Sequence, residues 1–243
     1  MNFFIGIWEK LEHNFIEGER WRWVLEGLGN TLILTFFALI LGVVIAIVVA
    51  SIRSTFDKTK DAIKRKNKVA YFFFWLANSI CNIYLTVIRG IPVVVQIMII
   101  YYIIFASSTN ELMNAVVAFG INSGAYVAEI FRGGIMSIDE GQFEAGRSLG
   151  FNYFQTMRLI IIPQVFKTTL PTLCNEFIVL LKETAVAGYI GVMDLNKSAE
   201  NIRGYTYDPL TPLLVIAAIY LILVIVLTKL VSLLEKRLRK NER

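Results

Sequence analysis

The 243-residue sequence contains one histidine, His13, and two cysteines, Cys81 and Cys174. The histidine lies in a polar N-terminal segment, so no histidine-based triad or metal cluster can form within an apolar segment. Both cysteines lie in apolar surroundings and are expected to be small core residues rather than a disulfide framework. A phosphate-cradling GxxxxGK[ST] motif is also missing, so any ATP must bind to another chain. We therefore expect no enzyme activity, no metal and no cofactor in this chain.

Charged residues make up only 18% of the sequence, whereas 56% of the residues are hydrophobic and the mean hydropathy is +0.61. Soluble domains average nearer 45–50% apolar residues. The formal net charge is +5, but the basic residues flank apolar runs, which favours a membrane over nucleic acid as the partner. No cleavable signal peptide is apparent at the N-terminus. These features predict an all-α integral membrane protein that binds no nucleic acid.

About five apolar segments are predicted to cross the membrane. Residues 30–52 carry no charge and form the first span, which is expected to end at Arg53. Residues 69–87 leave two alternatives, because the segment either spans or lies flat at the cytoplasmic interface. The flat arrangement is preferred because it keeps Arg89 on the basic side. The other spans are residues 93–106, 112–130, 167–187 and 209–228.

The predicted organisation has three parts, namely an interfacial segment (residues 1–29), a transmembrane domain (30–234) and a basic cytoplasmic tail (235–243). Of the 24 Lys and Arg residues, eighteen fall on the side assigned to the cytoplasm and five on the outer side. This distribution follows the positive-inside rule and predicts an external N-terminus and a cytoplasmic C-terminus. Residues 57–68 are the most basic cluster, and the sequence indicates no function for them beyond a solvated charged run. Residues 188–207 are expected to be a polar outer loop.

A polar stretch, SIDEGQFEAGRSLG, interrupts the apolar segments at residues 137–150. Ser137 with Glu140 predicts a capping box at a helix start. Gly150 predicts the left-handed residue that closes a helix. We therefore expect a helix of about three turns over residues 138–149, roughly 18 Å long.

A second helix is predicted directly after this turn. Asn152 with Gln155 indicates its start. Pro163 lacks a backbone N–H and is expected to end or kink it.

Polar side chains within apolar segments are the candidates for a solute-binding site, because their insertion into a membrane is costly. Glu176 lies in the middle of the fourth span next to Asn175, and Lys182 follows about two turns later. These residues predict either a polar pocket for a charged or zwitterionic solute or an internal Glu176–Lys182 ion pair. Glu129 ends the third span, where the structural alternative is a surface ion pair with Arg132.

The polar stretch resembles the cytoplasmic loop of ABC importer permeases, which reads EAA-x3-G-x9-I-x-L-P. The matching residues here are Glu144, Ala145, Gly146, Gly150, Ile160, Ile162 and Pro163. Gly146 replaces the second alanine and Ile162 replaces the leucine, and both changes leave the spacing intact. The flanking sequences YLTVIRGIPVVVQ (84–96), AYVAEIFRGG (125–134) and NEFIVLLKET (175–184) resemble the polar amino acid permeases of the histidine, glutamine, arginine and cystine uptake branch. The resemblance extends from about residue 29 to the C-terminus, although the basic cluster is longer than in that branch.

This resemblance implies the type I permease fold of ABC importers, in a bacterial inner membrane, with the short polar helix as the coupling helix. The residues implied to dock on the ATPase are Glu140, Phe143, Glu144, Ala145, Gly146, Arg147 and Gly150. The candidates for substrate contact are Asn175, Glu176, Lys182 and Glu129. The implied partners are two cytoplasmic ATPase subunits that bind ATP and magnesium, a second identical or related permease chain, and an external solute-binding protein. The implied substrate is a polar or charged amino acid.

Three other functions agree less well with the sequence than an amino acid permease does. An ABC permease for another small solute is compatible with the loop motif, but the flanking sequences argue against it. An ion-coupled secondary transporter needs no ATPase, and the internal inverted repeats of many such folds are not visible. A membrane anchor has no reason to carry polar groups within the fourth span. The segment from Arg89 to Pro92 is interpreted as a structural elbow.

Overall fold

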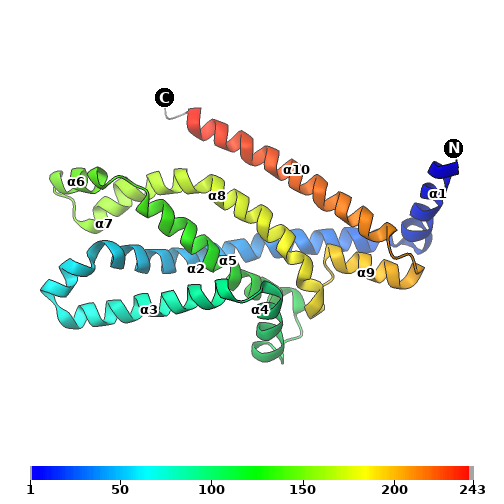
Figure 1. The fold of residues 1–243 in the computed structure, drawn as a ribbon, viewed down its shortest axis with the longest axis horizontal. Coiled ribbons are helices and arrows are strands. Elements are labelled where there is room, and N and C mark those ends of the chain that lie inside the picture. The colour runs from blue at the N-terminus through cyan, green and yellow to red at the C-terminus, as the bar shows by residue number, and fades with distance from the viewer. Residues whose placement is uncertain (1, 241–243) are drawn as a thin grey trace. The chain divides into compact units, whose positions relative to one another are not determined.

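The computed structural model describes residues 2–240, with the side chains of residue 6 and residues 8–238. All regular structure in this range is helical, as the sequence predicts. The elements are α1 (Asn2–Leu11), η1 (Glu12–Ile16), η2 (Glu17–Glu19), α2 (Trp21–Lys66), α3 (Lys68–Gly90), α4 (Val93–Ile99), η3 (Ile100–Ile104), α5 (Glu111–Met136), α6 (Glu140–Ser148), α7 (Tyr153–Thr156), η4 (Met157–Ile161), α8 (Ile162–Glu183), η5 (Thr184–Ile190), α9 (Leu195–Thr206) and α10 (Thr211–Lys240) (Figure 1). The chain divides into two compact units.

The helix that contains the first predicted span, α2, continues beyond Arg53, where the span was predicted to end. α2 continues through the basic residues 57–66, and its 46 residues extend about 69 Å at 1.5 Å per residue. Three consecutive cations occupy its last turn, where the helix dipole favours positive charge. Asn67 is the only residue between α2 and α3, and its side chain caps α3 by accepting hydrogen bonds from the backbone N–H groups of Val69 and Ala70. The basic run is therefore helical rather than a loop.

The first unit contains the N-terminal segment, Val93–Phe119 and Phe177–Leu230. Its buried apolar core is formed by Phe15, Val24, Leu195, Ala199, Ile202 and Ile216. Asn14 is fully buried and links the N-terminal segment to the α9–α10 connection. Its amide donates to Asp208 Oδ2 at 3.1 Å and its carbonyl oxygen accepts from Thr206 Oγ1 at 2.7 Å. The expected outer loop at residues 188–207 is thus wrong in part, because α9 occupies most of it and packs in this core.

Asp194 is fully buried and caps the start of α9. Its Oδ1 accepts a hydrogen bond from the Lys197 N–H at 2.6 Å, and its Oδ2 accepts one from the Gly188 N–H at 2.9 Å. Burial raises the pKa of the Asp194 carboxyl to about 6, the nearby Glu200 charge also raises it, and these backbone donors lower it. The folded chain therefore holds a proton on Asp194 more tightly than an unfolded chain does.

We expect the stabilising effect of Asp194 to decrease as pH rises. The protonated folded state is favoured below the ordinary pKa of 3.8, and that advantage is lost by about pH 6. Asp194→Asn keeps a capping oxygen but does not titrate. The unfolding free energy of the wild type relative to this variant should therefore fall by about 2 kcal/mol between pH 4 and pH 7. Thermal unfolding in detergent measures it, and a pH-independent difference would contradict the prediction.

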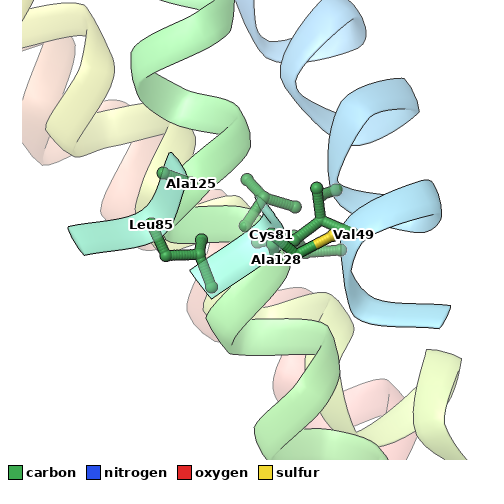
Figure 2. Close-up of a cluster of buried hydrophobic side chains, with 8 residues drawn as sticks. Val49, Cys81, Leu85, Ala125 and Ala128 are labelled. Atoms are coloured by element: carbon green, nitrogen blue, oxygen red, sulfur yellow. The ribbon is translucent and has the colours of Figure 1, made fainter. Parts of the chain in front are cut away.

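The second unit contains Leu39–Pro92, Gly120–Glu176 and the chain from Val231 onward. In it, α3 runs back alongside the later part of α2 (Figure 1). Its core brings together Ala46, Val49, Cys81, Leu85, Ala125, Val127, Ala128 and Leu173 (Figure 2). Both cysteines are free thiols, Cys81 buried and Cys174 half-buried, as the sequence predicts. α10 extends through the predicted basic tail as far as Lys240, and residues 241–243 lie outside the described residues.

Glycines bring α2 and α5 into close contact in the second unit. A Cβ atom on Gly120 would lie 2.7 Å from the Leu41 side chain, and one on Gly42 would lie 3.0 Å from the Gly124 backbone nitrogen. Gly120 and Gly124 are four residues apart on α5, the spacing at which small residues let membrane helices approach closely. This contact holds α5, and with it Glu129, against α2.

Among the described residues, three helices are long and apolar enough to cross a membrane by length and composition, namely Trp21–Lys66, Lys68–Gly90 and Thr211–Leu238. Val93–Ile104 is a shorter apolar helix. Length and composition therefore admit the spanning alternative for residues 69–87, against the flat arrangement preferred from the sequence. The count of about five spans stays a prediction.

Candidate functional site

α6 is the helix that the sequence predicted within residues 137–150, but its start differs from the prediction. Asp139 is the N-cap residue, and its Oδ1 accepts a hydrogen bond from the Gly141 N–H at 2.6 Å. Ser137 does not cap α6, because it directly follows α5 and its hydroxyl donates to the Gly134 carbonyl at 2.9 Å. The predicted Ser137–Glu140 capping box is therefore wrong. α6 has nine residues and is about 13.5 Å long, shorter than expected.

The end of α6 agrees with the prediction. Gly150 has a φ of +79°, the left-handed conformation that suits glycine. The Phe151 N–H donates to the Gly146 carbonyl at 3.0 Å, and the Gly150 N–H donates to the Arg147 carbonyl at 2.9 Å. This pair of hydrogen bonds is the Schellman motif. α6 is therefore a short helix with a defined stop.

The start of the next helix is confirmed, and of the two expected effects of Pro163 the helix end is not observed. The side chains of Asn152 and Gln155 each accept a hydrogen bond from the other residue's backbone N–H, at 3.0 and 2.9 Å. The chain then passes through the π-helical stretch η4 into α8 without ending. Pro163, which lacks a backbone N–H, is the second residue of α8 and directly follows this π-helical stretch. The change of helix type lies just before Pro163.

The two sides of α6 differ in burial. Phe143 is buried in a cluster with Ile138 and Ile161, and Gly146 is buried against Thr156. These two residues form the packing side of α6. The exposed residues among the predicted docking set are Glu140, Glu144, Ala145, Arg147 and Gly150. Docking through these residues stays a prediction.

Ion pairs connect α2 and α5 in the second unit. Arg132 Nη2 lies 3.1 Å from Glu129 Oε2, the pair that the sequence offered as a structural alternative, and Arg132 Nη1 lies 3.5 Å from Asp57 Oδ2. Arg53 Nη1 lies 3.4 Å from Glu129 Oε1 and donates to Asn82 Oδ1 at 2.8 Å. The charged side chains in this series are all less than one-third exposed. Partial burial makes their mutual attraction stronger than at an open surface.

A polar pocket of about 490 Å³ lies beside this series. Its lining residues are Arg53, Asn82, Leu85, Thr86, Arg89, Gly90, Tyr126 and Glu129. Small-molecule sites in proteins typically have about 300–1,000 Å³ and a few convergent polar groups. The pocket contains two guanidinium groups and one carboxylate, so it has complementary partners for both a carboxylate and an ammonium group.

Arg89 has a second role besides the elbow that the sequence predicted. α3 ends at Gly90, and Ile91 is extended before Pro92, as the residue preceding proline prefers. The Arg89 guanidinium carbon lies 5.6 Å from the centroid of the Tyr126 ring. No carboxylate among the described side chains forms an ion pair with Arg89, and Arg53 Nε is buried without a hydrogen-bond partner among them. Arg89 therefore offers its donors to a bound anion, whereas the Arg53 guanidinium is shared with Glu129 and Asn82.

The other predicted substrate contacts lie on α8 and do not line this pocket. Asn175 and Lys182 are exposed, and Glu176 is half-buried. Asn175 and Lys182 are seven positions apart in the sequence and share one face of α8, whereas Glu176 and Lys182 are six positions apart and lie on different faces. Of the four predicted contacts, only Glu129 is a pocket residue.

The sequence analysis did not select most of the pocket residues, although their spacing in the sequence indicates shared helix faces. Asn82, Thr86 and Arg89 follow one another at intervals of four and three, which places them on one face of α3. Tyr126 and Glu129 are three residues apart on α5. A search for polar residues at helical spacing in neighbouring segments finds both groups.

The sequence matches a known protein family. Residues 69–240 match the profile described as "Binding-protein-dependent transport system inner membrane component". The chain belongs to this family. It is a membrane-embedded permease subunit of an ABC importer, in which a separate chain hydrolyses ATP, so this permease is not itself an enzyme. Membership also implies an ATPase and a solute-binding protein as partners.

Individual relatives match two thirds or more of the permease. The arginine transport system permease protein ArtQ of Bacillus subtilis (strain 168) is 36% identical over 223 residues, which are 90% of this chain and 94% of the relative. The glutamine transport system permease protein GlnP of Escherichia coli (strain K12) is 38% identical over 170 residues, which are 68% of this chain and 77% of the relative.

Two solved structures share the fold of the permease. The crystal structure of an amino acid ABC transporter with histidines superposes with a TM-score of 0.76 at 39% identity, covering 89% of this chain and 94% of the other. The inward-facing MetNI methionine ABC transporter has a TM-score of 0.70 at 19% identity, covering 88% and 95%. The second likeness shows the fold alone. The type I permease fold expected from the sequence is thereby confirmed.

Proposed function

We propose that this permease imports a polar or charged amino acid, and that the pocket lined by Arg89 and Glu129 binds the amino acid in transit. Relatives named for arginine and glutamine transport, and a solved amino acid transporter at 39% identity, support this substrate class. The single observation that carries the proposal is a polar pocket that places Arg89, which has no ion-pair partner among the described side chains, near the carboxylate of Glu129.

The chemistry of the pocket fits a zwitterion. Arg89 donates to the substrate carboxylate, because guanidinium groups bind carboxylates in a planar, bidentate way, and Arg53 shares its guanidinium between this carboxylate and Glu129. Glu129 and the Tyr126 ring receive the substrate ammonium group, since a ring face attracts a cation. Asn82 and Thr86 provide hydrogen bonds to a polar side chain. Asn175, Glu176 and Lys182 on α8 are proposed as further contacts along the pathway.

The complex that we propose contains two permease chains, identical or related, and two ATPase subunits that bind ATP and magnesium. An external solute-binding protein delivers the amino acid, the N-terminus is outside, and the C-terminus is in the cytoplasm. The exposed side of α6 contacts the ATPase, and its packing side is joined to the core through Phe143. Closure of the ATPases then moves α6 together with the helices that pack on it.

Transport in liposomes tests the proposal. The permease is reconstituted with its ATPase and solute-binding protein, and uptake of labelled arginine, glutamine and histidine is measured. Arg89→Gln should lower uptake at least tenfold, because a charge-assisted hydrogen bond contributes about 1.5–3 kcal/mol. Arg65→Gln is the matched control, since Arg65 is exposed at the end of α2 and outside the pocket. Normal uptake by Arg89→Gln, or no amino acid uptake by the wild type, would refute the proposal.

A further inference from the structure

The basic run, residues 57–68, has one member that differs from the others. Lys60, Lys64, Arg65, Lys66 and Lys68 are exposed to solvent. The Lys58 side chain is only 13% exposed and forms an ion pair with Glu140, the first residue of α6. Its Nζ also lies 4.7 Å from the centroid of the buried Phe143 ring. Lys58 therefore contacts both the start and the packing side of the coupling helix.

Asp57, the neighbour of Lys58, begins a connected series of charges that ends in the pocket. Asp57 pairs with Arg132, and Arg132 pairs with Glu129. Glu129 in turn pairs with Arg53, and both of these residues line the pocket. In the basic extension of α2, Lys58 thus contacts the coupling helix, and the adjacent Asp57 belongs to the series of charges that ends in the pocket.

We propose that Lys58 and Asp57 are positioning residues that couple the occupancy of the pocket to the placement of α6. A substrate carboxylate competes with Glu129 for Arg53, and the substrate ammonium group competes with Arg132 for Glu129. The attraction between Arg132 and Asp57 changes as a result, and Asp57 is one residue from the lysine that holds α6. This inference rests on the proposed function, because it takes the pocket as the substrate site.

The coupling works in both directions by thermodynamic linkage. If an occupied pocket favours one placement of α6, the same placement of α6 must favour an occupied pocket. The position of Lys58 over the Phe143 ring is favourable, since the attraction of a cation to an aromatic ring is strongest when the cation is partly desolvated. Lys60, an exposed lysine on the same helix, serves as an internal control.

The test measures the number of amino acid molecules transported per ATP hydrolysed, in liposomes that contain the complete complex and labelled arginine, glutamine and histidine. Lys58→Gln removes the charge but keeps most of the stem. We expect it to lower the ratio at least threefold while the ATPase stays bound. Lys58→Arg keeps the cation and should stay within twofold of the wild type. Lys60→Gln removes an exposed charge from the same helix and should have no effect.

Asp57→Asn provides a second measurement that leaves α6 untouched, and it decides the outcome if Lys58→Gln loses the ATPase. It should also lower the ratio at least threefold, because it breaks the contact with Arg132. An unchanged ratio in Asp57→Asn overturns the inference, as does equal loss in Lys58→Arg and Lys58→Gln. A wild type without amino acid uptake instead refutes the proposed function, whereas normal wild-type uptake with an unaltered ratio in the variants refutes the coupling alone.

Discussion

Gly134→Leu should prevent the permease from folding, whereas Gly133→Leu should leave it folded. A Cβ atom on Gly134 would lie 2.3 Å from Thr169 Cγ2 and 3.1 Å from Val165 Cγ1, both on α8, and a leucine adds three more carbons at this contact. A Cβ atom on Gly133 meets nothing within 4 Å among the described residues. The adjacent glycines thus form a matched pair in one helix, and only one of them allows α5 and α8 to approach closely.

Alanine variants make this prediction quantitative. Overpacking typically costs about 1–3 kcal/mol, so Gly134→Ala should lower the unfolding free energy, although alanine's helix propensity offsets up to about 1 kcal/mol of the loss. Gly133→Ala should be neutral or stabilising by up to about 1 kcal/mol. Thr169→Ser removes the methyl group at the contact and should partly restore Gly134→Ala. Thermal unfolding in detergent measures all three, and equal stability of the two alanine variants would contradict the packing.

Glu144→Arg should release the ATPase from the permease, with at least a tenfold drop in the ATPase that copurifies. Glu144 lies on the exposed side of α6, and its side chain is 70% exposed. Its contact with Arg147 is 3.8 Å long and adds little to stability at such an exposed site. The loss therefore reports on docking rather than on unfolding, because the substitution replaces an acidic group with a basic one on a surface proposed to meet a partner.

The matched control for this prediction is Glu200→Arg. Glu200 is exposed on α9, which the proposed topology places outside, and it pairs with Lys197 in the same helix at 3.0 Å. Unfolding temperatures of both variants should stay close to that of the wild type. If Glu144→Arg copurifies with a full complement of ATPase, α6 is not the docking helix.

The sequence predicted the features of this permease that depend on local chemistry. The left-handed Gly150, the capping pair of Asn152 and Gln155, and the elbow before Pro92 all follow from backbone preferences of single residues. The predicted N-cap of α6 was wrong because Ser137 and Asp139 are both good capping residues. Only the position at which α5 ends decides between them. That position is set by packing.

The pocket was less predictable because it depends on which helix faces are brought together. Glu129 was found from its cost of burial in an apolar segment, but its pairing with Arg53 joins residues 76 positions apart. The sequence did not predict that α2 extends beyond Arg53, because a dense run of cations is typical of a solvated loop. The run is recognised as helical only when the helix end and a partner such as Glu140 are known. Lys58 could be separated from its exposed neighbours only by its contacts.

Asn67, the one-residue joint between α2 and α3, restricts how the length of this hairpin can vary. A residue added to either helix alone would turn the following face by about 100° and move the packed groups by about 1.5 Å. Cys81 and Leu85 would then point away from Val49 and the α5 alanines. Longer or shorter versions of the hairpin that keep this face inward should therefore differ by about seven residues, two helical turns, in each arm. We therefore expect single-residue insertions to be tolerated in other parts of the chain rather than in this hairpin.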